Sequence, residues 1–286
     1  MIVYKTLEET QLSSLYTAFS EAFAEYYVDI KLSFERFQTM LLRRGVDLRY
    51  SIGAFHQDMM VGFIICGIRR WKSALTGYDI GTGIIPEYQR QGISTEIMNR
   101  LFELLAANQI NNFMLEVIKA NKPALELYLK SGFEVSRSFS CYRRPQMDSP
   151  SAFAAKTAIL ESDLENLKWD TLTQFWDYLP SWQNSIDSLL ATPTSFACIQ
   201  AQSDHQTIGY GIIERVTGDI PQLAVQKDHR QRGVGMLIIN ELAKKSSSNK
   251  ITCLNVDEQA RMTNNFLIHR GFQHYADQFE MIRKLQ

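Results

Sequence analysis

The chain has 286 residues, of which 45% are hydrophobic and 21% are charged. Since a typical domain has roughly 100 to 200 residues, this length suggests two globular domains, and the composition argues against a disordered chain. Lys and Arg number 30 against 31 Asp and Glu, so the formal net charge is -1. A balanced chain has no general electrostatic attraction to nucleic acid or to an anionic membrane surface, and we expect neither as a partner.

The predicted elements of the first half alternate between strands and helices. Ser33 and Glu35 mark the start of the second helix, and a turn at 56–58 joins two strands. In chain order the pattern predicts strand 3–5, helix 9–27, helix 33–45, strands 48–55, 59–68 and 78–85, helix 97–109, strand 113–119, helix 123–130 and strand 133–144. This order is typical of an α/β (α+β) fold, with a mixed β-sheet flanked by helices.

An internal repeat relates the two halves of the chain. Residues 84–96 and 225–237 each join a strand-like segment to an apolar-periodic helix, and Gly233 follows Gly92 by 141 residues. Each half then closes on a Gly-Phe pair, and these pairs are 139 residues apart. The repeat indicates two copies of one domain. A Pro- and Ser-containing stretch at 144–153 is typical of a linker, so we place the domains at 1–146 and 147–286.

The repeated segments 89–94 and 230–235 each lie between a predicted strand and the start of a helix. Backbone N–H groups there lack helical partners and point outward, which favours anion binding. A glycine-relieved turn explains a single copy equally well, but two copies at matching positions favour a phosphate-binding loop. The loops contain neither GK[ST] nor GxGxxG, so nucleotide hydrolysis and hydride transfer are disfavoured.

The loop pattern Q/R-x-x-G-x-G/A resembles the acetyl-CoA pyrophosphate loop of the GNAT (GCN5-related N-acetyltransferase) superfamily. The segment LEVIKANKPALELYLKSGF at 115–133 resembles the strand and helix that follow it in that superfamily. The resemblance covers nearly the whole chain as a tandem pair of GNAT domains, although Ser94 stands where Gly or Ala is usual. It implies twisted sheets splayed after the fourth strand, with the cofactor in the splay.

The resemblance also implies which residues bind acetyl-CoA. Main-chain groups of Ile84 and Ile85, and of Val225 and Gln226, would hold the pantetheine arm, and Asn121 would be a further contact. The pyrophosphate would be held by Gln89, Arg90, Gln91, Gly92, Ile93 and Ser94 in the first half, and by Arg230, Gln231, Arg232, Gly233, Val234 and Gly235 in the second.

Acetyl transfer to an amine needs a base, because the amine is mostly protonated at neutral pH, and an acid for the leaving thiolate. Glu116 and Tyr128 lie twelve residues apart in the first half. Their surroundings resemble the ribosomal-protein alanine N-acetyltransferases of the superfamily, which implies Glu116 as base and Tyr128 as acid. The alternatives are a tyrosine that packs on the sheet and a solvated strand glutamate.

The second half has Asn255 and Leu267 at these two positions, and neither side chain can transfer a proton. Asp219 is either a substitute base or a turn residue after Gly218. We therefore predict a catalytic N-terminal domain and a C-terminal domain that binds acetyl-CoA or has a structural role. Two alternatives stay open: catalysis in the C-terminal domain, as in mycothiol-synthase-like tandem proteins, and a non-catalytic acyl-CoA-binding protein.

The expected reaction is transfer of acetyl from acetyl-CoA to a primary amine by direct attack, because neither half has a Cys or Ser nucleophile beside a His. The acceptor would be a small molecule or a peptide, and the protein a monomer or homodimer. Lone cysteines and histidines predict reduced thiols and no metal site. No apolar run approaches the ~18 to 20 residues of a membrane helix, and the N-terminus does not resemble a secretion signal. We expect a cytoplasmic protein.

Three of the four tryptophans fall within fourteen residues, at Trp169, Trp176 and Trp182. In GNAT domains the corresponding region covers the acceptor site. The cluster therefore predicts an aromatic lid, an interface between the halves, or ordinary core packing.

Overall fold

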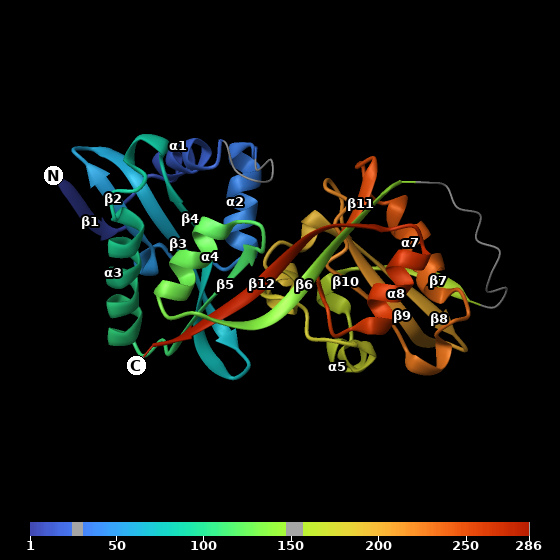
Figure 1. The fold of residues 1–286 in the computed structure, drawn as a ribbon. Coiled ribbons are helices and arrows are strands. Elements are labelled where there is room, and N and C mark those ends of the chain that lie inside the picture. Colours follow the sequence, from blue (N-terminus) through green and yellow to red (C-terminus); the bar gives the residue numbers. More distant parts are fainter. Residues whose placement is uncertain (25–30, 147–156, 286) are drawn as a thin grey trace. The chain divides into compact units, whose positions relative to one another are not determined.

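The computed structural model describes residues 1–24, 31–146 and 157–285. The chain forms two compact units, Met1–Arg137 together with Phe279–Gln286, and Ser138–Gln278. Figure 1 labels the elements of both units. No helix among the described residues is long and apolar enough to cross a membrane.

The first unit is built on a mixed sheet. Strands β1 to β4 pair antiparallel in chain order, and β5 joins β4 in parallel. Its elements are β1 (Ile2–Thr6), α1 (Leu12–Ala22), α2 (Phe34–Arg43), β2 (Ile52–His56), β3 (Met59–Trp71), β4 (Ala74–Ile84), α3 (Ile93–Ala107), β5 (Asn112–Ile118), α4 (Lys122–Lys130) and the start of β6 (Glu134–Pro145). The predicted α/β class is confirmed.

Most predicted boundaries agree with these elements to within a few residues. Ser33 caps α2, since its Oγ accepts a hydrogen bond from the Arg36 N–H at 3.3 Å. The strand predicted from residue 48 begins only at Ile52, because Leu48–Tyr50 forms a 3₁₀ turn capped by Asp47. Part of the predicted helix 9–27 lies outside the described residues.

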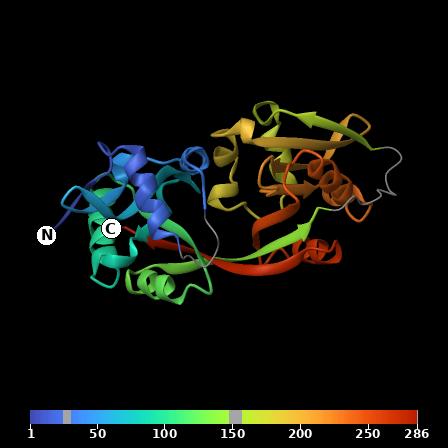
Figure 2. The same ribbon diagram turned by 90° about the horizontal axis from the view of Figure 1, so that it is seen from above.

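Helices cover both faces of this sheet. Phe19 of α1 packs toward Gly81 of β4, whereas Ile93 and Ile97 of α3 pack toward Gly62 of β3 on the other face. Tyr128 of α4 joins the core cluster on the α3 side. Figure 2 shows α1 and α4 on opposite sides of the strands of this unit.

The sheet of the first unit opens between β4 and β5. These strands pair only from Thr76↔Asn112 to Tyr78↔Met114, although β4 continues to Ile84. Just beyond the last pair, the register of β3 and β4 shifts, so that Ile80 has no partner on β3. The predicted splay after the fourth strand is therefore present, and a β-bulge lies where β4 and β5 separate.

The second unit repeats this plan with shorter elements. Its four-stranded antiparallel sheet has the order β10-β9-β8-β7, and β11 pairs with the end of β6. Among the described residues, a single bridge, Asp219↔Thr252, joins the segment before β10 to β11. Strands β10 and β11 therefore separate in the same way as β4 and β5. The elements are β7 (Ala158–Ser162), α5 (Trp169–Leu172), α6 (Ile186–Leu190), β8 (Phe196–Ser203), β9 (Gln206–Glu214), β10 (Gln222–Val225), α7 (Val234–Ala243), β11 (Lys250–Asp257), α8 (Arg261–His269) and β12 (Gln273–Lys284).

The compact units do not divide where the sequence border was placed. The division falls after residue 137 rather than 146, and residues 279–286 belong to the first unit. The cause is a pair of long neighbouring strands: β6 begins in the first unit and ends in the second, whereas β12 does the reverse. Much of the predicted linker lies outside the described residues.

Candidate active site

The two glycine loops have the same backbone conformation. Arg90 and Gln231 have φ of 62° and 60°, and Gly92 and Gly233 have φ of 78° and 86°. Gly92 is the N-cap of α3 and Gly233 that of α7. Two left-handed residues separated by one other residue curl each loop around the free N–H groups of the helix start, a shape that suits an anion.

The first residue of each loop fixes the loop to the preceding strand. Gln89 Nε2 donates to the carbonyl of Ile84 at 3.2 Å, and Arg230 Nε donates to the carbonyl of Val225 at 2.8 Å. The contact is the same at positions 141 residues apart. It explains why the first loop can have Gln89 where the second has Arg230, since both side chains present an N–H to the strand.

Two of the main-chain N–H groups predicted to hold the pantetheine arm already form hydrogen bonds within the protein. The Ile85 N–H donates to the Val61 carbonyl at 3.0 Å, and the Gln226 N–H donates to the Ile208 carbonyl at 2.8 Å. Both amides are therefore bound to the neighbouring strand. Contacts from Ile84–Ile85 and Val225–Gln226 to a pantetheine arm remain a prediction that has to use their other main-chain atoms.

A cavity of about 460 Å³ lies beside the second loop, between β10 and α8. Its walls include Leu223 and Phe266, and Arg230 and Arg270 also line it. Apolar walls, two guanidinium groups and a helix N-terminus suit a ligand that combines a pyrophosphate with an apolar arm. The residues present therefore fit coenzyme A.

Residues 175–178 form one wall of this cavity. Asp177 Oδ1 accepts from Arg230 Nη1 at 2.8 Å, and its Oδ2 accepts from Thr263 Oγ1 at 2.9 Å. Trp176 lines the cavity and donates through Nε1 to Tyr210. Of the three clustered tryptophans, Trp182 is fully buried, so the cluster serves partly as a cavity wall and partly as core.

In the first unit, Tyr128 meets an aspartate that the sequence analysis did not single out. The Tyr128 hydroxyl donates to Asp79 Oδ2 at 3.4 Å, and Thr82 Oγ1 donates to the same oxygen at 2.7 Å. Asp79 lies on β4 beside the bulge and is only 8% exposed. Burial raises the pKa of its carboxyl to about 6, against the lowering effect of the two hydroxyl donors.

The second carboxylate, Glu116, lies on β5 two residues beyond the last pair with β4. It is partly exposed, unlike Asp79, although its Oε1 is buried. Burial, and after it the charge of Glu116, raises the pKa of Tyr78, which places Glu116 near the same opening. The splay of the first unit is thus bordered by two carboxylates and a phenol.

Asn121 lies at the start of α4, where its side chain accepts from the Ala124 N–H at 3.2 Å. This bond makes it the N-cap of the helix that carries Tyr128. The predicted cofactor contact of Asn121 is not tested by this bond and stays a prediction.

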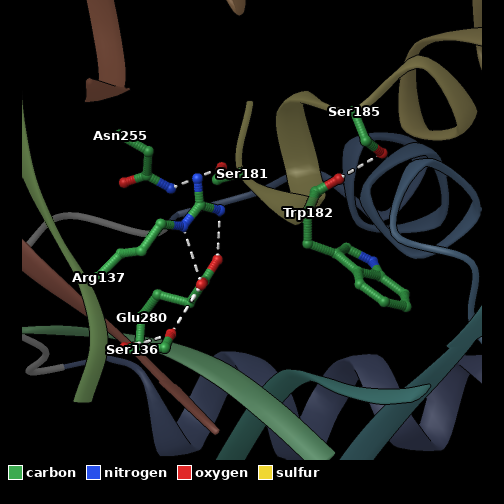
Figure 3. Close-up of polar contacts among 7 residues, drawn as sticks. All are labelled: Ser136, Arg137, Ser181, Trp182, Ser185, Asn255 and Glu280. Carbon is green, nitrogen blue, oxygen red and sulfur yellow. Dashed lines mark hydrogen bonds and ion pairs between the residues drawn. The ribbon is translucent and has the colours of Figure 1, made fainter. Parts of the chain in front are cut away.

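The second unit has no comparable proton-transfer groups at the matching positions. Leu267 is buried in the core, and Ile220 stands where the first unit has Asp79. Asn255 is fully buried and donates through Nδ2 to Ser181 Oγ at 3.0 Å, as Figure 3 shows. Asp219 accepts from Thr252 Oγ1 at 3.2 Å at the bridge to β11, which fits a structural role.

Sequence reasoning missed Asp79 because its partner Tyr128 is 49 residues away. One signal was available: Asp79 stands alone in the otherwise uncharged segment YDIGTGII. A charged residue in a buried strand is uncommon unless it has a partner or a function.

Comparison with known proteins agrees with this geometry. Residues 11–133 match the model of the acetyltransferase (GNAT) family, and residues 165–281 match that of an acetyltransferase (GNAT) domain. Among curated proteins, the N-alpha-acetyltransferase MAK3 of Arabidopsis thaliana is 29% identical over 96 residues, 34% of this chain and 50% of that protein. N-alpha-acetyltransferase 50 of Danio rerio is 28% identical over 83 residues, 29% of this chain and 49% of that protein. The chain thus spans about half the length of these relatives.

Solved structures share the fold over the whole chain. A tandem GNAT protein from the clavulanic acid biosynthesis pathway has a TM-score of 0.78 at 13% identity, covering 100% of this chain and 99% of that one. A GCN5-related N-acetyltransferase from Sphaerobacter thermophilus has a TM-score of 0.73 at 13% identity, covering 100% and 96%. With a family match in each half and this shared fold, the chain belongs to the GNAT acetyltransferase family as a tandem member.

Proposed function

We propose that this protein transfers acetyl from acetyl-CoA to a primary amine, and that the first unit carries out the reaction. The observation that carries this proposal is the contact between Tyr128 and Asp79 at the splay of the first unit. The matching positions of the second unit hold Leu267 and Ile220, which cannot exchange protons.

Both glycine loops would hold the pyrophosphate of acetyl-CoA, through the N–H groups at the starts of α3 and α7. Bound acetyl-CoA supplies the thioester that the amine attacks. In the first unit Tyr128 protonates the leaving thiolate. The base is a carboxylate at the splay: the resemblance assigns Glu116, and the geometry adds Asp79. Main-chain N–H groups at the β4 bulge are candidates for stabilising charge on the carbonyl oxygen.

The acceptor follows from the relatives only as a class. Both curated relatives are named N-alpha-acetyltransferases, so a peptide with a free α-amine is the first acceptor to test, with small-molecule amines beside it. The four cysteines are buried and none of them forms a disulfide, which supports a cytoplasmic location. We propose a monomer or homodimer that needs no metal.

The test is thiol release from acetyl-CoA by the full chain, across a panel of peptides and small amines, with product mass as a second readout. Tyr128→Phe is expected to lower kcat by about 10² to 10⁴-fold, since it removes only the acidic hydroxyl. Tyr4→Phe, in β1 of the same unit, is the matched control and should keep full activity.

Two outcomes would overturn this assignment. Unchanged turnover in Tyr128→Phe would move the chemistry out of the first unit, toward the C-terminal alternative. Binding of acetyl-CoA without thiol release from any amine would favour a non-catalytic acyl-CoA-binding protein.

A further inference from the structure

The phenol of Tyr128 has a single hydrogen, and its oxygen lies 3.4 Å from Asp79 Oδ2, where it can donate that hydrogen to the carboxylate. An ionised carboxylate attracts a hydroxyl hydrogen more strongly than a neutral carboxyl does. Tyr128 can therefore give its hydrogen to a leaving sulfur most easily when Asp79 has itself become protonated. The protonation state of Asp79 controls whether Tyr128 can act as an acid.

Asp79 also has an oxygen that no described residue uses. Its Oδ1 is buried and has no hydrogen-bond partner within the described part of the chain, while Oδ2 accepts from Thr82 and Tyr128. Leaving a buried carboxylate oxygen without a donor is costly, so such an atom is a candidate for a bond made only with substrate.

Besides Tyr128, the groups around Asp79 come from its own strand, from β3 and from the residue that follows α2. Thr82 and the Gly81 N–H belong to its own strand, and Arg44 contributes a positive charge. Cys66, opposite Asp79 on β3, and Tyr78 both have raised pKa values, mainly through burial. These two are neutral at physiological pH, which leaves Asp79 and Tyr128 as the pair able to exchange a proton there.

A protonated primary amine loses two protons on becoming an amide, whereas the leaving sulfur gains only one. The first unit offers two carboxylates in different surroundings, Glu116 partly exposed and Asp79 buried. A partly exposed carboxylate can exchange its proton with water. A buried carboxyl in contact with a phenol is suited to pass its proton to that phenol and not to water.

We propose that Glu116 takes the first amine proton and releases it to water, and that Asp79 takes the second and passes it through Tyr128 to the coenzyme A sulfur. This inference rests on the proposed function. As the C–N bond forms and the C–S bond breaks, Asp79 accepts the remaining N–H proton. Tyr128 gives its own proton to sulfur, and the Asp79 proton restores the phenol. One proton reaches sulfur and one reaches water, so the reaction balances.

The test compares Asp79→Asn with Glu116→Gln in the full chain. Asparagine keeps the shape and can still accept hydrogen bonds from Thr82 and Tyr128, but it cannot take a proton. Asp79→Asn is expected to lower kcat by about 10² to 10⁴-fold with little change in the KM for acetyl-CoA. The wild-type kcat should fall as pH is lowered through about 6, because Asp79 becomes protonated there and can no longer accept the amine proton. The variant should lose this inflection.

Glu116→Gln should behave differently, because its role ends once the amine is neutral. An acceptor amine of low pKa, which is already neutral at the assay pH, should restore most of its activity but none of that of Asp79→Asn. The double variant of Asp79→Asn and Tyr128→Phe should be no slower than the slower single variant, since both residues serve one path.

Wild-type kcat in Asp79→Asn, or rescue of that variant by the low-pKa amine, would overturn the proton path. Unaltered acetyl-CoA affinity and a cooperative melting transition at or above the wild-type temperature show that a slow variant is still folded. If the wild-type chain turned over no amine at all, the proposed function itself would fail, which is a distinct result.

Discussion

The Asp79 carboxyl makes the folded protein less stable at neutral pH than it would otherwise be. Burial raises its pKa from 3.8 to about 6, so the folded state binds a proton more readily than the unfolded state between these values. The free energy of unfolding therefore falls as pH rises from 3.8 to about 6, where the buried carboxyl becomes ionised. We expect Asp79→Asn to raise the free energy of unfolding near neutral pH by about 1 to 3 kcal/mol.

Urea unfolding at about pH 4.5 and about pH 7.5 checks this prediction. The difference between Asp79→Asn and wild type should shrink at the lower pH, where wild-type Asp79 is largely protonated. A difference of the same size at both pH values would contradict the desolvation argument. A gain in stability with a loss of turnover is what a residue kept for chemistry should show.

At the scale of single residues, the sequence predicts some members of the proposed site and not others. Tyr128 is predictable because its spacing from Glu116 and from the Gly-Phe pair matches a family pattern. Asp79 is not, because its role comes from a contact between β4 and α4 that only the tertiary fold creates. Asn255 similarly gains its fixed position from Ser181, which is 74 residues away.

Among the elements, β6 and β12 are joined by a buried ion pair in the first unit. Arg137 Nη2 lies 2.6 Å from Glu280 Oε2, and the two side chains are 13% and 2% exposed. Ser136 Oγ donates to Glu280 Oε1 at 2.7 Å, and Figure 3 shows the three residues together. Glu280 thus gathers two donors from neighbouring positions of the adjacent strand.

Glu280→Ala is expected to lower the free energy of unfolding by about 3 to 5 kcal/mol, because Arg137 would stay buried without this carboxylate. Glu96→Ala is the matched control: its pair with Arg100 in α3 is more than 40% exposed on both sides. Removal of that pair should cost less than about 1 kcal/mol. Equal losses in urea unfolding would show that burial does not set the strength of the strand pair.

Strand and helix order was predictable because local periodicity determines it. The conformation of the two loops was predictable because a tight turn before a helix needs glycine at a fixed place, and Gly92 and Gly233 both have left-handed φ. The late start of β2 was not predictable, since the side chain of Asp47 caps a 3₁₀ turn in a segment with strand-like composition. Local hydrogen bonding overrides propensity there.

For the whole molecule, the sequence border at 146 would separate the first unit from part of its core. Met281 and Leu285, near the end of the chain, are 0% and 8% exposed in the core cluster of the first unit. The Leu285 N–H also donates to the Asn111 carbonyl at 2.7 Å. Such long-range pairing leaves no local signal, so a border drawn from composition cannot show it.

A fragment of residues 1–146 is therefore expected not to fold stably. Loss of a buried Met or Leu side chain costs about 2 to 5 kcal/mol, and this fragment lacks both Met281 and Leu285. Fusing residues 273–286 to it through a flexible linker should restore cooperative unfolding, measured by circular dichroism. A stable fragment without this addition would show that β12 is dispensable and that the border at 146 is the true one.

The tandem arrangement also predicts how many acetyl-CoA molecules one chain binds. The two loops share backbone angles and the bond from their first residue to the preceding strand, although only the first unit has the Asp79–Tyr128 pair. We expect native mass spectrometry to show two bound molecules per chain. Binding in the second unit should proceed without turnover.

Valine at a loop glycine should abolish one site, because it combines a left-handed φ with a side chain where the phosphate is expected. Gly92→Val should leave one bound molecule and no turnover, whereas Gly233→Val should leave one and keep kcat. Gly132→Val and Gly271→Val are the controls, since both positions have φ of +80° but lie outside the loops. Loss of activity in Gly233→Val, with its control active, would assign the chemistry to the second unit instead.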